Sequence, residues 1–207
     1  MNTPIEVYLS LLLAIISAFL GGLIAVYTKE EIKKYFKQIS AFKEVIIFAI
    51  GLILLITNER PIYIALTIFA FGAATTTILN KFWLGKYNRM FELALLGLIL
   101  GGVFNINLTF AFLITSLIVI YNLIAESLTI EPLLSKKAEY DFKMIAVTQM
   151  ALLVGFLFSF ILFTATKVIP TAFIIYVSGA LIFLVFEPGK NKELTIKINK
   201  RKISRKK

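Results

Sequence analysis

Seven long apolar stretches follow one another along the chain, and they constrain its fold more than any other feature. They span residues 4–27, 42–57, 61–80, 90–104, 108–126, 143–166 and 168–186. About 20 helical residues, rising 1.5 Å each, cross a hydrocarbon core of about 30 Å, and five of the stretches meet that length. Lipid offers the backbone no hydrogen-bond partner, so continuous apolarity predicts helices. We expect an all-α, polytopic integral membrane protein with seven transmembrane helices.

The overall composition is that of a membrane protein rather than a soluble domain. Hydrophobic residues make up 59% of the 207 positions and mean hydropathy is +0.88, whereas soluble domains hold about 45–50% apolar residues. We expect a transmembrane domain over 1–187 and a basic cytoplasmic tail over 188–207. The first stretch has only Glu6 ahead of its apolar run and a basic segment after it, so we interpret it as a retained helix, not a cleaved signal peptide.

Basic residues are distributed unevenly between the connectors. Twenty of the twenty-two Lys and Arg residues lie in the first, third and fifth connectors, in the first residues of the stretches that follow them, and in the tail. Arg60 and Lys167 are the two on the other side. Short basic loops stay in the cytoplasm, so the asymmetry predicts an external N-terminus and a cytoplasmic C-terminus in the cell membrane. It also favours full crossing over re-entry for the short second stretch, because the basic clusters before the second and after the third stretch would otherwise lie on opposite faces.

The chain contains neither Cys nor His. This excludes disulfides, thiolate-held clusters, histidine-ligated metals and an imidazole base. No catalytic constellation stands out, and we expect no cofactor and no bound metal. Lys outnumbers Arg eighteen to four, which, with abundant Ile and Phe, is typical of an archaeal or thermophile protein.

Small residues recur one turn apart in several of the stretches. In lipid this spacing lets helix backbones approach closely. The alternative is a kink or a carbonyl-lined ion site at the glycine pairs, and a hinge in the last stretch. The candidate packing or hinge residues are Gly21, Gly22, Gly97, Gly101, Gly102, Gly155, Tyr176 and Gly179.

A Leu-Gly-Gly triplet occurs at residues 20–22 and again at 100–102. The first and fourth stretches, which contain it, run in opposite directions across the membrane. One interpretation is an inverted repeat of the first three and the next three helices, with the seventh appended. The match does not extend into the second and fifth stretches.

Four polar residues are candidates for an ion or polar site near the cytoplasmic ends of the helices. Asn122 and Glu126 lie four apart and share a helix face, Gln149 lies inside the sixth stretch, and Asn80 ends the third. A carboxylate held among apolar side chains suits a proton relay or a cation site. The alternative places Glu126 at headgroup level, with Asn122 and Gln149 only bridging helices.

Two charged residues at the edges of the stretches are interpreted as interfacial. Glu92 follows Arg89 by three residues, and we expect an interfacial ion pair of little energetic value. Lys43, at the start of the second stretch, is expected to extend toward the lipid headgroups.

The tail carries nine basic residues and a single acidic one, Glu193. Residues 190–207 include no aromatic side chain on which a base would stack, so we expect no nucleic acid as a partner. A basic segment next to a membrane attracts anionic lipid, at about 1 kcal/mol per residue. We expect anionic lipid to bind the tail.

The segment 173–184, with the sequence FIIYVSGALIFL, resembles a helix of a known family. It is similar to the Tyr-Val-Gly-Ala-containing helix of a small hydrophobic subunit in proton-pumping NADH dehydrogenases and energy-converting hydrogenases. In that family the helix has a π-type distortion linked to ion movement. Here Ser178 separates Val177 from Gly179, and the helix is last rather than mid-chain, which departs from the motif. The resemblance implies an accessory membrane subunit without a cofactor, and draws attention to Tyr176 and Gly179.

Three functions follow from these observations. The favoured one is a non-catalytic accessory subunit of a larger, ion-translocating membrane complex, with membrane protein partners or further copies of the chain. The first alternative is a small secondary transporter or channel with a polar site near Asn122, Glu126 and Gln149. The second is an intramembrane lipid-modifying enzyme, for which Glu92 and Glu126 are the available acidic residues.

Overall fold

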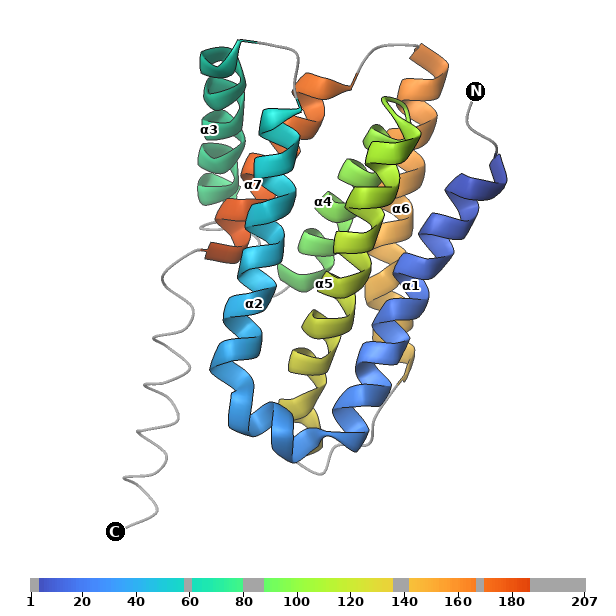
Figure 1. Cartoon of the computed structure of the whole chain (residues 1–207), viewed down its shortest axis with the longest axis vertical. Helices are drawn as coiled ribbons and strands as arrows, with labels where there is room; N and C mark the ends of the chain where they lie inside the picture. The colour runs from blue at the N-terminus through green and yellow to red at the C-terminus, as the bar shows by residue number, and fades with distance from the viewer. Residues whose placement is uncertain (1–3, 58–60, 80–87, 136–141, 167–169, 187–207) are drawn as a thin grey trace.

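The computed structural model describes residues 4–57, 61–79, 88–135, 142–166 and 170–186 (Figure 1). Within these ranges every regular element is an α-helix, and there are seven. They are α1 (Pro4–Tyr27), α2 (Lys29–Ile56), α3 (Ile62–Leu79), α4 (Asn88–Val103), α5 (Leu108–Ser135), α6 (Phe142–Thr166) and α7 (Thr171–Phe186). The all-α prediction is confirmed for this part of the chain, and each helix contains one predicted apolar stretch or most of it.

Four of the helices are long and apolar enough to cross a membrane. The qualifying segments are Ile5–Tyr27, Lys29–Ile56, Leu108–Thr129 and Ile145–Thr166. Two shorter apolar segments, Ile62–Ile78 and Thr171–Val185, lie in α3 and α7. The membrane class is therefore supported by helix length and composition, as the sequence predicted.

Helix α2 differs from its predicted extent. The sequence predicts a connector before residue 42, whereas the helix begins at Lys29 and includes this charged segment. Tyr35 has non-helical torsions (φ −104°, ψ 16°) and marks a kink. In Figure 1 the first turns run across the base of the bundle before the helix turns upward. Lys and Glu are good helix formers, which explains why a charged connector is helical here.

The bundle is built from three close helix pairs, α1 with α5, α4 with α6, and α3 with α7. Each pair meets at a glycine. A Cβ added to Gly21 would collide with the backbone oxygen of Leu123 in α5, and one added to Gly97 with that of Leu152 in α6. Gly72 of α3 stands against α7 in the same way. Small residues at these positions allow the backbones to touch, which is how helices pack where lipid supplies no hydrophobic drive.

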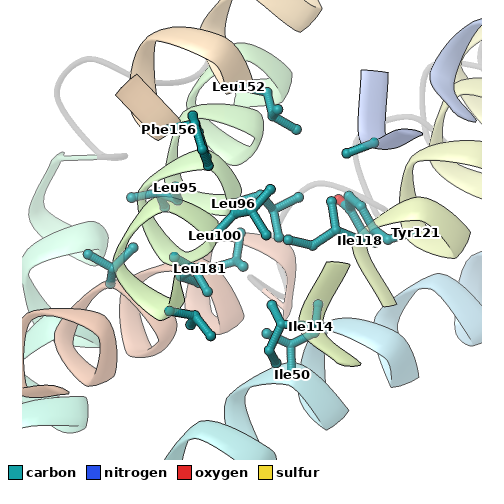
Figure 2. Packing of buried hydrophobic residues seen from close by; sticks show 14 of the residues in the cluster. Ile50, Leu95, Leu96, Leu100, Ile114, Ile118, Tyr121, Leu152, Phe156 and Leu181 are labelled. Carbon is teal, nitrogen blue, oxygen red and sulfur yellow. The ribbon is translucent and has the colours of Figure 1, made fainter. Parts of the chain in front are cut away.

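Helix α4 lies at the centre of the bundle. Leu93, Leu96, Ile99 and Leu100 have no exposed surface, and the helix packs on α5, α6 and α7. Figure 2 shows Leu96 and Leu100 among side chains of α5, α6 and α7. Large exposed apolar side chains belong mainly to α1, α2, α3 and α6, whose outer faces suit contact with lipid. An enclosed α4 also explains why its apolar stretch is short.

The packing does not follow the suggested inverted repeat. A symmetry that exchanges α1 with α4 and α2 with α5 would turn the close α1–α5 pair into an equally close α4–α2 pair. In the described part of the chain α4 instead packs closely on α6, while α2 packs on α5 and α7. Gly21 faces Leu123 of α5, whereas Gly101 faces Phe156 of α6. The two Leu-Gly-Gly triplets therefore occupy non-equivalent contacts.

A candidate ion site between helices 2, 4, 5 and 6

Arg89, in the first turn of α4, joins two carboxylates from different helices. Its Nη2 and Nε atoms lie 3.0 and 3.3 Å from Oε1 of Glu126 in α5. Its Nη1 atom lies 3.1 Å from Oε2 of Glu92, one turn along α4. The planar guanidinium offers five N–H donors in a fixed fork, and this arrangement uses three of its nitrogens for the two acids.

Tyr121 and Lys43 complete the network around Glu92. The Tyr121 hydroxyl of α5 donates to Oε1 of Glu92 and accepts from Nη1 of Arg89 at 3.1 Å. The Lys43 ammonium of α2 lies 3.6 Å from the same Glu92 oxygen. Both cations also approach the face of the Tyr121 ring, Lys43 at 5.8 Å and Arg89 at 5.3 Å from its centroid. Tyr121 is fully buried beside Ile118 of the core (Figure 2).

This network is charge-balanced and largely buried. Two cations, Lys43 and Arg89, face two carboxylates, Glu92 and Glu126. The exposed fraction of the side chain falls from 22% for Lys43 and 18% for Arg89 to 9% for Glu92 and 2% for Glu126. Charges removed from water in this way are costly unless paired, and here each one is. We call these four residues with Tyr121 the ion network.

The structure corrects two interpretations of the charged residues. Glu92 and Arg89 do not form an isolated pair, because Glu92 is buried, the Arg89 side chain is largely enclosed, and the contacts continue to Glu126 and Tyr121. Lys43 does not simply extend outward, since its ammonium is paired with Glu92. Glu126 itself points into the bundle toward Arg89, while its depth relative to the lipid headgroups stays a prediction.

The predicted polar residues lie beside the ion network. Gln149 of α6 donates from Nε2 to Oε1 of Glu126 at 3.4 Å. Asn122, one turn before Glu126 on α5, donates from Nδ2 to the Ala14 carbonyl oxygen of α1 at 2.9 Å. Both side chains are buried. Asn80 lies outside the described residues. The structure thus brings the predicted residues Glu126 and Gln149 together, whereas the sequence missed Lys43, Arg89, Glu92 and Tyr121 as members of the site.

The glycines singled out from the sequence lie at helix contacts. Gly21, Gly97, Gly101, Gly155 and Gly179 each stand against the backbone of a neighbouring helix. Gly102 faces the side chain of Ile174, and Gly22 is buried. These contacts agree with the packing interpretation rather than with a hinge.

Helix α7, which carries the family resemblance, packs regularly against α3. It is α-helical from Thr171 to Phe186, with no π-type turn in this range. Gly179 stands against the backbone of Phe69 in α3, and the ring of Tyr176 lies 6.0 Å from that of Phe71. The implied distortion is not present in this helix.

A half-open cavity lies toward the other ends of α2 and α5. Its volume is about 250 Å³, and its walls include Leu54 of α2, Phe110 of α5 and Ile174 of α7. Thr57 and Asn107 add polar atoms, but Asn107 already caps α5 by accepting hydrogen bonds from the backbone of Thr109 and Phe110. No member of the ion network lines this cavity.

No protein-family model matches the chain, and neither a curated protein nor a solved structure is significantly similar to it. The ion network and its polar neighbours are therefore the features from which a function can be inferred.

Proposed function

We propose that the chain is a multi-pass cell-membrane protein that moves a cation by means of its ion network, as a small secondary transporter or channel. In this proposal all seven helices cross the membrane, with the N-terminus outside and the C-terminus in the cytoplasm. The twenty basic residues on one side support that orientation. The network then lies in the cytoplasmic half of the bundle, because it includes the first turn of α4 and the later part of α5.

One observation carries the proposal, namely that Arg89 is shared between two buried carboxylates. An ionisable group inside a membrane bundle is costly, and such groups mark proton relays and ion pathways. The shared guanidinium has two alternative partners, Glu92 and Glu126. A cation or proton arriving at Glu126 neutralises it, and Arg89 keeps its contact with Glu92. The network can therefore accept a positive charge at one acid without leaving its own cations unpaired.

Lys43 offers a route for compensating that charge. It is the most exposed member and contacts a single carboxylate, at a distance of 3.6 Å. When a cation neutralises Glu126 and Arg89 turns fully to Glu92, the ammonium of Lys43 is the group most easily released toward water. Entry of one cation and withdrawal of another keep the buried charge constant, which lowers the electrostatic cost of the step.

Flux through the purified protein tests this function. Proteoliposomes with an imposed gradient of protons or of a monovalent cation are expected to show flux that falls at least ten-fold in Glu126→Gln. Glu31→Gln is the matched control, because Glu31 is an exposed acid on α2 outside the network. Flux that is absent from the parent protein, or equal in parent and Glu126→Gln, contradicts the proposal.

The accessory-subunit function remains the second candidate, and the position of α3 favours it. This helix packs mainly on α7, at the edge of the bundle (Figure 1). Its exposed face presents small residues one turn apart, Ala70 and Ala74, flanked by Thr67 and Thr77. Such a face suits close contact with another transmembrane helix. Copurification of a second membrane protein in gentle detergent, lost on Ala70→Leu, would support this function.

The lipid-modifying enzyme is the least supported of the three. It would use Glu92 and Glu126 as its paired acids, and the structure brings them to the same region. Both are paired with Arg89, however, and neither lines the cavity at the other ends of α2 and α5.

A further inference from the structure

Two buried carbonyl oxygens near Glu126 have no hydrogen-bond donor among the residues that the structure describes. They are Oδ1 of Asn122 and Oε1 of Gln149, whose residues are 0% and 3% exposed. A buried acceptor without a partner is unfavourable, and most such atoms in proteins are satisfied. Their presence on α5 and α6, which are linked by the hydrogen bond between Glu126 and Gln149, points to a ligand that supplies positive charge.

The orientation of both amides follows from their neighbours. The Asn122 nitrogen donates to the Ala14 carbonyl oxygen, and the Gln149 nitrogen donates to the Glu126 carboxylate. Exchanging nitrogen and oxygen in either amide would set an oxygen against another oxygen. In each amide the nitrogen must therefore be the atom that faces the neighbouring acceptor. The carbonyl oxygen is the atom without a donor in the described part of the chain.

Glu126 adds a third oxygen. Its Oε1 atom accepts hydrogen bonds from Arg89 and Gln149, while its Oε2 atom accepts none within the described part of the chain. Asn122 and Glu126 lie on one face of α5, and Gln149 reaches that face from α6. One turn before Glu126 on α5, and across its contact with α6, there are thus two amide oxygens that accept no hydrogen bond in the described part of the chain, beside the ion network.

We propose that Glu126, Gln149 and Asn122 bind a sodium ion. Oxygen atoms are the ligands that hard cations prefer, and the set contains no nitrogen or sulfur ligand. A single carboxylate, already next to Arg89, favours a monovalent ion over a divalent one. Sodium at this position satisfies both orphan oxygens and competes with Arg89 for Glu126. This inference depends on the proposed function, in that it names the cation that the network moves.

Equilibrium binding of radioactive sodium to the purified full-length protein in detergent tests the site. The parent protein is expected to bind sodium saturably, with choline chloride holding ionic strength constant and potassium competing at least ten-fold more weakly. Glu126→Gln and Gln149→Leu are each expected to weaken binding at least ten-fold. Ser159→Ala is the matched control, because Ser159 is also buried in α6 with an unpartnered hydroxyl, ten residues from Gln149.

Several outcomes would overturn the sodium site. One is the absence of saturable binding by the parent protein, as expected if the two oxygens bind only water. Another is unchanged binding in variants that unfold as cooperatively as the parent. If those variants do not fold, the sodium site is judged from the parent protein alone, by whether its sodium binding is saturable and selective over potassium. Flux in proteoliposomes that needs Glu126 but proceeds equally without sodium would overturn the sodium site and leave the proposed function standing.

Discussion

Arg89 is the residue on which the ion network depends, because it is the only member that contacts both carboxylates. In Arg89→Ala, Gln149 is the remaining hydrogen-bond donor to Glu126 among the described residues, and Glu92 keeps Lys43 and Tyr121. Breaking a buried ion pair from one side costs about 3–5 kcal/mol. We expect that loss in the free energy of unfolding, measured by reversible denaturation in mixed detergent.

Two comparisons make the Arg89 result specific. Arg89→Lys keeps the charge but loses the planar fork, so we expect an intermediate loss. Lys37→Ala, at an exposed position of α2, should change stability by less than about 0.5 kcal/mol. A free energy of unfolding for Arg89→Ala equal to that of Lys37→Ala would show that the network contributes nothing to the fold.

The sequence identifies some members of the site and not others for a physical reason. Asn122 and Glu126 stand out because an i, i+4 pair of polar residues inside an apolar helix must share a face. Gln149 stands out because an amide side chain is rare inside an apolar stretch. Lys43 and Tyr121 do not, because a lysine at a helix edge and a tyrosine in a membrane helix have ordinary explanations. Their membership depends on how α2 and α5 both meet α4, which no single stretch encodes.

At the scale of the helix pair, glycine controls how closely α1 and α5 approach. Gly21→Ala places a Cβ against the backbone oxygen of Leu123, which cannot move without shifting α5. Overpacking typically costs about 1–3 kcal/mol, and we expect a loss of that size in the free energy of unfolding. The same separation should weaken the hydrogen bond between Asn122 and Ala14, two turns earlier on α1.

Gly51→Ala is the matched control for this prediction. A Cβ there meets chiefly the terminal methyl of Ile182, the end of a flexible side chain that can rotate away. We expect a loss well below that of Gly21→Ala, and the helix propensity of alanine offsets part of it. If both substitutions have the same effect, backbone contact at Gly21 is not what limits the approach of the helices.

Helix existence was easier to predict than helix extent or partner choice. Apolar length locates seven helices, but it treats the charged segment before residue 42 as a connector, whereas that segment extends α2 back to Lys29. The pairing of α4 with α6 could not be predicted either. Apolar helices offer little amphipathic pattern to distinguish partners, so the choice is made by small residues such as Gly97 and Gly155, each of which meets the other helix's backbone.

For the whole molecule, the number of membrane crossings depends on the short central helix α4. It has 16 residues, about 24 Å at 1.5 Å per residue, which is less than a hydrocarbon core of about 30 Å. Enclosure by α5, α6 and α7 removes the need to match lipid thickness on all sides. We therefore expect three crossings between Lys34 and Ile106, which places these residues on opposite faces of the membrane.

The absence of native cysteine allows this topology to be measured without background labelling. Lys34→Cys and Ile106→Cys both introduce a thiol at an exposed position. A membrane-impermeant maleimide should label Ile106→Cys in intact cells, and Lys34→Cys only after permeabilisation. Labelling of both from the same face means an even number of crossings between them, so that one of α2, α3 and α4 fails to span. In that case the basic segments would no longer share one side, and the cytoplasmic placement of the ion network would be lost with them.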